Sequence, residues 1–477
     1  LKKCEFMPML LTQIFQCYDR YMDEDVKVKA EQYIKQALPL AAEESIHPTM
    51  YNDNFANMAT YTLLSAGEYF NLPEYVEIGR DKLEQFCDVF RRCGTIMEYS
   101  SPTYSAIHLL CFAEMYNHLK DPQLRQMAAM CEERMWVEMA THYHAETAHL
   151  AGPYSRAYTA DTIGHPNIVC SLFWKVFGER CFINPMKDFF PIRDNQVVHI
   201  SANALLLPNV AWILGTTYHF PEYLLPVALE KKYPYHVEMA VECLSADALA
   251  YNEDDDEPYG AFGGHRSTTT TFMTKEYSMG TAQQQYHSGS ATEGFYVTYK
   301  NCDEAKTLMD TGVIYTHYVF NDKRPNFKNR YAYYGEMHEC NFRDEGRKFG
   351  LQHENTALVV YKPLHLEAKQ VRSAKLTVFV PSHFYEDFKL IAGGKEITSL
   401  PYASTEPVTV CIQAHRSMFA FIPLELTNLG REAAVRIEMK DQHLQIFFYN
   451  YEGEEKAFEF MDLINTRNGF VCVAGTL

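Results

Sequence analysis

The residues best suited to chemistry lie in one stretch, HYHAETAHLAGPYSRAYTADTIGHPN at residues 142–167. An arginine guanidinium presents a planar fork that matches a carboxylate. Tyrosine or histidine can exchange a proton when nearby charge tunes its pKa. Because Gly152-Pro153 breaks regular structure, we expect the residues after it on an irregular segment or a new helix start, where functional groups concentrate. The candidates are His142, His144, Tyr154, Arg156, Tyr158, Asp161 and His165.

Further polar and aromatic candidates occur in other segments of the chain. NDN and EYSSPTY precede apolar helical stretches, and Ser101-Pro102 is typical of an N-cap followed by a first-turn proline. Asn amides and His N–H groups can share the negative charge that grows on a carboxylate as its α-proton leaves. Together with Arg and Tyr they predict β-elimination next to a uronic acid, which requires no metal or organic cofactor. These additional candidates are Asn52, Asn54, Glu98, Tyr99, Tyr104, His199, Tyr277, Tyr286 and His287.

The first half of the chain must position these residues, and its apolar spacing is helical. Residues 54–70 and 103–118 each predict a helix that is followed by a short turn and a second helix. The two blocks align as a helical-hairpin repeat of just under fifty residues, which predicts stacked hairpins in an (α/α) toroid. Inner helices of such a ring begin at one rim, so we expect the polar segments to line one mouth. The matched positions are Ala66 with Ala113, Tyr69 with Tyr116 and Pro73 with Pro122.

The second half changes its pattern after the acidic and then glycine-rich segment 252–265. Short runs rich in β-branched and aromatic residues follow, with Gly, Pro, Asn and Asp between them, which is typical of an antiparallel β-sandwich. The predicted fold is therefore an α+β multidomain chain. Residues 1–255 form an (α/α) toroid of helical hairpins, and residues 256–477 form an antiparallel β-sandwich.

Composition limits the classes of partner. The chain has 477 residues, with Lys+Arg 43 against Asp+Glu 61 and a formal charge of -18, which argues against nucleic acid as a partner. No apolar run reaches the roughly 18 residues of a membrane-spanning helix, so no membrane partner is expected. The 13 cysteines are scattered without a CxxC pair, which favours a reducing, cytoplasmic compartment and gives no metal-ligand spacing.

The order of the two halves resembles the heparinase II/III-like polysaccharide lyases and their alginate- and chondroitin-lyase relatives. The matching motifs are NDN, EYSSPTY, HYH with GPYSRAY and, more weakly, EYSMGTAQQQYHSG. The resemblance implies an acidic polysaccharide or oligosaccharide substrate and leaves a homo-oligomer open. It implies Asn54 and His144 at the substrate carboxylate, Tyr158 as the proton-transfer residue and Arg156 as its electrostatic partner. Tyr154 is the substitute for Tyr158.

Other interpretations stay open at the level of sequence. A glycoside hydrolase on the same toroid would use Glu98 and Asp161, which would have to lie roughly 5–9.5 Å apart. A carbohydrate-binding or scaffold protein without catalysis would also present an aromatic-lined trough. Individual residues have structural alternatives as well: the asparagines as helix caps, the histidines as interior residues, and Arg156 in a salt bridge with Asp161.

Overall fold

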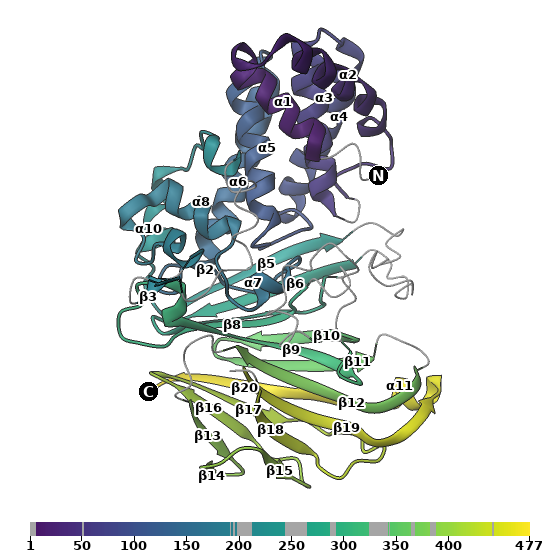
Figure 1. The fold of residues 1–477 in the computed structure, drawn as a ribbon, viewed down its shortest axis with the longest axis vertical. Coiled ribbons are helices and arrows are strands. Elements are labelled where there is room, and N and C mark those ends of the chain that lie inside the picture. The colour runs from purple at the N-terminus through teal and green to yellow at the C-terminus, as the bar shows by residue number, and fades with distance from the viewer. Residues whose placement is uncertain are drawn as a thin grey trace.

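The molecule is built in three layers, helices on one sheet and a second sheet beneath it (Figure 1). The computed structural model describes residues 6–49, 52–190, 192–193, 196–197, 212–243, 265–286, 292–323, 342, 344–363, 368–381, 388–440 and 443–477. The helices come first in the chain and the antiparallel sheets follow, as the sequence predicts. Within the described residues, no helix is long and apolar enough to cross a membrane.

The helical layer consists of consecutive antiparallel hairpins. Helix α3 packs on α5 and α4 packs on α6, while α1 and α2 pack on α3. Helices α3 and α5 are buried along almost their whole length, whereas α4 and α6 bury one face. Pro73 and Pro122 are the first residues of α4 and α6, where a missing N–H costs no helical hydrogen bond. The helices are α1 (Phe6–Tyr18), α2 (Glu24–Ala41), α3 (Asp53–Tyr69), α4 (Pro73–Cys93), α5 (Tyr104–His118) and α6 (Pro122–His142).

Shorter elements connect the hairpins to the sheets. They are the hairpin β1 (Tyr143–His144) and β2 (His149–Leu150), the helices α7 (Thr159–Thr162), α8 (Ile168–Phe177) and α10 (Leu225–Leu229), and the hairpin β3 (Ile192–Arg193) and β4 (Gln196–Val197). The 3-10 turns are η1 (Asp19–Tyr21), η2 (Gly178–Arg180), η3 (Pro185–Asp188), η5 (Glu222–Leu224) and η6 (Leu308–Asp310).

Two antiparallel sheets form the second half of the chain. The nine-stranded sheet has the order β15-β18-β19-β12-β9-β8-β7-β6-β5, and the seven-stranded sheet the order β10-β11-β20-β17-β16-β13-β14. The first contains β5 (Tyr235–Cys243), β6 (His265–Met273), β7 (Tyr277–Ala282), β8 (Phe295–Lys300), β9 (Thr311–Phe320), β12 (Ala368–Pro381), β15 (Tyr402–Ser404), β18 (Val435–Lys440) and β19 (His443–Phe458). The second contains β10 (Gly346–His353), β11 (Thr356–Pro363), β13 (Phe388–Ala392), β14 (Lys395–Ile397), β16 (Val410–Ala414), β17 (Ser417–Pro423) and β20 (Asn468–Thr476), and α11 (Phe460–Asn465) precedes β20.

The central strands β7, β8 and β9 of the nine-stranded sheet are buried on both faces. Consecutive residues of a strand point to opposite faces, and strand β8 shows the result. Phe295 packs against Phe421 and Phe470 of the other sheet, whereas Tyr296 belongs to the core shared with the helices. The sandwich core and the helical core therefore meet across a single sheet.

The sheet begins earlier than the predicted boundary between residues 255 and 256. Strand β5 starts at Tyr235 and pairs antiparallel with β6, with Tyr235 opposite Met273. Its exposure alternates residue by residue, which is the pattern of an edge strand with one face in solvent. His236 and Glu238 occupy two of the solvent-facing positions, so the sequence of the strand is not a continuous apolar run.

Close backbone contacts join the helical layer to the sheet. Tyr154 and Glu293 exchange backbone hydrogen bonds at 2.8 and 3.0 Å. Thr271 Oγ1 donates to the Gly152 carbonyl at 2.8 Å. Gly280 on β7 lies so close that a Cβ there would be 1.7 Å from the Gly152 oxygen. The GPYSRAY segment is thus held between the helices and the sheet.

Candidate functional site

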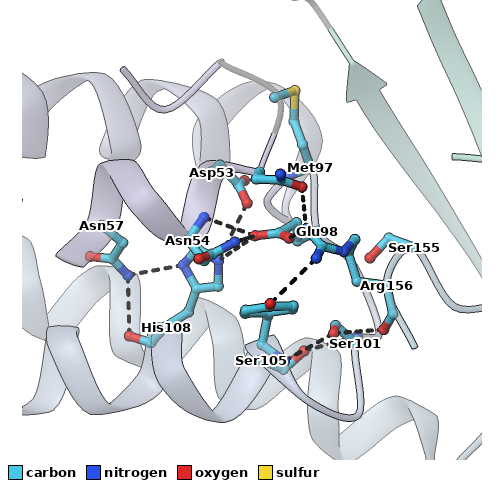
Figure 2. Close-up of polar contacts among 12 residues, drawn as sticks. Asp53, Asn54, Asn57, Met97, Glu98, Ser101, Ser105, His108, Ser155 and Arg156 are labelled. Carbon is cyan, nitrogen blue, oxygen red and sulfur yellow. Dashed lines mark hydrogen bonds and ion pairs between the residues drawn. The ribbon is translucent and has the colours of Figure 1, made fainter. Parts of the chain in front are cut away.

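A buried polar cluster lies where the inner helices α3 and α5 begin. Figure 2 shows Asp53 and Asn54 from the start of α3, Glu98 from the preceding loop of the next hairpin, His108 from α5, and Arg156 from the GPYSRAY segment converging on one another. We call this group the Arg156 cluster. Its members are Asn52, Asp53, Asn54, Asn57, Glu98, Tyr104, His108, Arg156 and Tyr158.

Glu98 is at the centre of the cluster and is completely buried. Its Oε1 accepts a hydrogen bond from Arg156 Nη1 at 3.0 Å. Its Oε2 accepts from the backbone N–H of Asn54 at 2.8 Å and from Asn54 Nδ2 at 2.6 Å. The Asn54 N–H belongs to the first turn of α3, so Glu98 caps that helix from another hairpin. Burial alone would raise the pKa of Glu98, but the adjacent His108 and the Arg156 charge outweigh it and lower the pKa.

Asp53 and His108 form the second charged pair. His108 Nε2 lies 3.3 Å from Asp53 Oδ1 and 3.6 Å from Glu98 Oε2. Burial by itself would lower the pKa of His108, but the two facing carboxylates raise it to about 9. The Asn57 amide nitrogen lies 3.0 Å from His108 Nδ1, and within the described part of the chain its Oδ1 makes no hydrogen bond, so turning the amide over lets Oδ1 accept from a protonated Nδ1. At neutral pH an imidazolium and a guanidinium thus balance two carboxylates.

Arg156 links this charged core to two tyrosines. Its Nη2 donates to the hydroxyls of Tyr104 at 3.3 Å and Tyr158 at 3.4 Å, and these hydroxyls lie 2.5 Å apart. The guanidinium carbon is 4.6 Å from the centre of the Tyr104 ring, a cation–π distance. Burial raises the pKa of Tyr104 well above its ordinary value, so this hydroxyl keeps its proton. Tyr158 is only partly buried, so the cluster extends toward the surface at this residue.

Short polar contacts hold the backbone of Arg156 and Tyr158 in place. Ser101 Oγ donates to the Arg156 carbonyl at 2.8 Å and accepts from the N–H of Tyr104 at 2.9 Å. The N-cap position of α5 is Thr103 and not the predicted Ser101, which instead bonds to the first N–H of the helix from the turn before it. Asp161 Oδ2 accepts from the N–H of Tyr158 at 2.9 Å and from a threonine hydroxyl of the loop before α5. Asp161 therefore positions Tyr158, and the partner of Arg156 is Glu98.

Asn52 and the second half of the chain complete the border of the cluster. Asn52 has a left-handed backbone conformation with φ 60°, and its side chain makes no capping hydrogen bond to α3. Instead, its Oδ1 accepts from Arg156 Nη1. The Tyr286 hydroxyl lies 3.4 Å from the backbone nitrogen of Asn52, and the ring of Tyr286 packs edge-on against Tyr99 at 6.2 Å.

His142 and His144 do not join the Arg156 cluster. His142 Nδ1 lies 2.9 Å from the Glu138 carbonyl oxygen at the end of α6, and burial lowers its pKa to about 4. His144 Nε2 lies 2.8 Å from the carbonyl oxygen of Thr274, a loop residue that follows β6, and burial lowers its pKa to about 3. The chain after α6 turns into the β1–β2 hairpin, which aims His144 at the sheet and not at the rim.

Tyr154 and Tyr277, two of the predicted site residues, also lie outside the Arg156 cluster. Tyr154 is buried, donates to the Leu150 carbonyl at 2.5 Å, and packs on Tyr296 with ring centres 4.4 Å apart. Tyr277 lies in the sandwich core against Phe419. His165 is buried between α7 and α8, and His199 and His287 lie outside the described residues.

Asp53, Asn57 and His108 are members that the sequence did not single out. Asp53 stands between two predicted asparagines, and His108 follows the predicted Tyr104 by four residues, which puts both on one helix face. The feature of the sequence that could have identified His108 is that it is an isolated histidine in an otherwise apolar helix. Nothing local to Asn57 distinguishes it from an interior polar residue.

Asp53, Glu98 and His108 bring three ligand atoms within 4.8 Å of one another. Both oxygens of Glu98 already accept hydrogen bonds, from Arg156 and from Asn54. The charges of Arg156 and His108 also balance the two carboxylates. Because Glu98 is fully engaged and the charges are balanced, we assign no metal to this cluster.

Comparison with known proteins finds one family model, of a domain of unknown function, and only distant likenesses among solved structures. A family model described as "Domain of unknown function (DUF8769)" matches residues 18–204, a range that contains the whole Arg156 cluster. No curated protein matches the sequence. A solved chondroitinase AC lyase in complex with oligosaccharides is 6% identical, with 99% of this chain and 68% of that chain covered and a TM-score of 0.39. A heparan sulfate lyase HepC mutant from Pedobacter heparinus is 8% identical, with 98% and 68% covered and a TM-score of 0.34. Both are distant similarities in fold, too weak to assign a role to any residue.

Proposed function

We propose that this chain cleaves a uronic-acid-containing polysaccharide or oligosaccharide by β-elimination, with Tyr158 as the catalytic acid and base. The observation that supports it is the position of the Tyr158 hydroxyl. Tyr158 is partly buried whereas Tyr104 is buried, and both the Arg156 guanidinium and the protonated Tyr104 hydroxyl face the Tyr158 hydroxyl. A phenol with donors around its oxygen can take up and return a proton.

In this reaction the hydroxyl of Tyr158 first loses its proton to solvent, and the resulting phenolate removes the proton from C5 of the uronate. The electron pair of the C5–H bond forms the C4=C5 double bond, and the C4–O bond to the leaving sugar breaks. The proton then passes from Tyr158 to the leaving oxygen, so no proton is gained or lost. Negative charge grows on the carboxylate during the first step, and donors preorganised toward it lower the barrier.

We assign the carboxylate to Asn52 and Arg156, which lie beside Tyr158 at the partly exposed edge of the cluster. Asn54 is completely buried, and its amide donates to Glu98, so in this proposal it is a positioning residue. His144 has no role in it, because its two ring nitrogens face Thr147 and Thr274.

Glycoside hydrolysis by Glu98 and Asp161 has less support. Glu98 is fully buried and its oxygens accept from Arg156 and Asn54. Asp161 is also buried, and its Oδ2 accepts from Tyr158 and Thr103. A general acid and a general base must both reach the sugar. The carboxyl groups of Glu98 and Asp161 are instead buried and accept hydrogen bonds from the protein itself.

The test is an ultraviolet absorbance assay for unsaturated uronides against alginate, glucuronan, hyaluronan, chondroitin and heparan sulfate. The wild type should produce the chromophore on one or more of these polymers, and Tyr158→Phe should lose about 100-fold or more of the rate. Tyr223→Phe is the matched control, because Tyr223 is exposed and its hydroxyl contacts Glu133. It should leave the rate unchanged.

Three results would contradict the proposal. New reducing ends without the chromophore would establish hydrolysis. Tight binding of a polymer without turnover would establish a binding protein. Full activity of Tyr158→Phe would remove Tyr158 from the chemistry and transfer the proton-transfer role to another residue.

A further inference from the structure

A second convergence of side chains lies at the other end of α5, where α1 also ends. Cys17 is on the last turn of α1, and Glu114 and His118 are four residues apart on the last turns of α5. His118 follows Tyr104 by fourteen residues, so this trio is roughly 20 Å along the helix from the Arg156 cluster. The two sites are separate, and this inference does not depend on the proposed lyase activity.

The three side chains converge on one point. Cys17 Sγ is 3.5 Å from His118 Nε2, and Glu114 Oε2 is 3.6 Å from the same nitrogen. All three ligand atoms lie within 4.8 Å of one another. In a nucleophile–base–acid triad, the nucleophile and the acid sit at opposite ring nitrogens of the histidine. Here both face Nε2, so the geometry is that of shared coordination and not that of a proton relay.

The spacing matches a tetrahedral metal centre. Zinc binds sulfur at about 2.3 Å, imidazole nitrogen at about 2.0–2.1 Å and carboxylate oxygen at about 2.0–2.2 Å. Tetrahedral angles then place sulfur and nitrogen about 3.6 Å apart and nitrogen and oxygen about 3.4 Å apart. The observed 3.5 and 3.6 Å fit these separations.

Glu114 provides the second, independent observation. It is 3% exposed, and among the described residues its Oε2 has no hydrogen-bond partner. Thr216 and Gln13, which hydrogen-bond to each other at 3.1 Å, also hydrogen-bond to the Glu114 carboxylate, which leaves Oε2 as the oxygen that faces His118. The Lys175 ammonium, a weaker influence on Glu114 than His118, donates to the carbonyls of Leu214 and Thr216. A buried carboxylate oxygen without a donor is the group that a bound cation would satisfy.

We propose that Cys17, Glu114 and His118 bind one Zn²⁺, with water in the fourth position. One thiolate, one imidazole and one carboxylate are ligands that zinc accepts, whereas magnesium and calcium select oxygen alone. Binding breaks the S–H bond of Cys17, whose proton passes to solvent, and uses the neutral His118 tautomer that keeps its proton on Nδ1 and leaves the Nε2 lone pair for the ion. His118 is exposed and Cys17 partly exposed, which leaves an entry path and a place for the water. The ion would tie the end of α1 to the end of α5.

The experiment uses the full chain after chelator treatment, titrated with Zn²⁺ by calorimetry and with Co²⁺ by absorption spectroscopy. We expect one high-affinity Zn²⁺ per chain, and for Co²⁺ a thiolate charge-transfer band together with tetrahedral d–d bands. Cys17→Ser should abolish the charge-transfer band, and His118→Gln should weaken Zn²⁺ binding by about 10-fold or more. Cys93→Ser is the matched control, because Cys93 is also partly buried but lies outside the trio, and it should change neither result.

Thermal unfolding of the same variants separates binding from folding. Zn²⁺ should raise the Tm of the wild type and of Cys93→Ser, and should not raise that of His118→Gln, whose exposed side chain makes it the variant least prone to misfold. Sub-stoichiometric Zn²⁺ binding, or a charge-transfer band that persists in Cys17→Ser, would overturn the proposal. Loss of the lyase activity leaves these readouts unaffected, so the two proposals fail separately.

Discussion

Replacing Arg156 with methionine tests whether the Arg156 cluster is held together by charge. The substitution keeps an unbranched stem and removes the guanidinium. Glu98 then remains completely buried while its Oε1 loses the donor at 3.0 Å. Removing one partner of a buried ion pair typically costs about 3–5 kcal/mol, because the remaining charge is left uncompensated. We expect Arg156→Met to lose free energy of unfolding in that range.

Urea unfolding followed by tryptophan fluorescence measures this loss. The chain has three tryptophans, Trp136, Trp174 and Trp212, and all precede the first strand of the nine-stranded sheet. The signal therefore reports on the helical layer. With an unfolding slope of about 2–3 kcal/mol per molar urea, the midpoint should fall by roughly 1–2 M. Arg91→Met is the matched control, since Arg91 pairs with Asp88 at 2.5 Å on an exposed face of α4 and should cost about 0.5 kcal/mol or less.

A double variant distinguishes charge from packing. Glu98→Met combined with Arg156→Met removes both charges, so no uncompensated carboxylate remains, and the double variant should unfold at a higher urea concentration than Arg156→Met alone. The reasoning fails if Arg156→Met has the same midpoint as Arg91→Met. It also fails if the two substitutions are simply additive, because the pair would then carry no coupling.

Two further predictions concern pH and the contact between layers. In the folded chain the pKa of His108 is raised from 6.5 to about 9. The protonated imidazole therefore makes its full contribution to the free energy of unfolding below pH 6.5, and this contribution is lost as the pH rises through 9. Between pH 6.5 and pH 9 the free energy of unfolding of the wild type, relative to that of His108→Gln, should fall by about 3 kcal/mol. If the urea midpoints of the two proteins instead change with pH in the same way, the imidazole is neutral throughout. Gly280→Ala places a Cβ 1.7 Å from the Gly152 oxygen and should cost about 1–3 kcal/mol or more in urea unfolding. Gly215→Ala, whose new Cβ would have no atom of a described residue within 4 Å, should cost far less. Equal losses for the two variants would mean that the contact between Gly280 and Gly152 does not hold the layers together.

Local signals in the sequence predicted much of the architecture. The repeated helix–turn–Pro pattern identifies the hairpins, since proline is free of penalty at the first helical position and α4 and α6 start at Pro73 and Pro122. Short β-branched and aromatic runs identify the sandwich in the same way. The sequence pattern did not predict strand β5, because an edge strand with one face in solvent carries polar residues between its apolar ones.

The candidate site likewise has features that the sequence predicted and features that it did not. Asn52, Asn54, Glu98, Tyr104, Arg156 and Tyr158 were selected by residue type, and they lie together because inner helices of stacked hairpins start at one rim. The pairing of Glu98 with Arg156 joins residues 58 positions apart, and no periodic pattern encodes it. The same holds for Asp53 with His108 and for Cys17 with His118, which lie on different helices.

By itself, then, the sequence determined the order and type of the elements, because helix and strand periods, caps and turns depend on neighbouring residues. Only the tertiary structure decided which polar side chains share a cluster. It placed Tyr158 at the surface of one cluster, turned His144 toward the sheet, and brought Cys17 to Glu114 and His118. The physical reason is that burial and charge pairing depend on contacts between distant segments, and these exist only once the layers have packed.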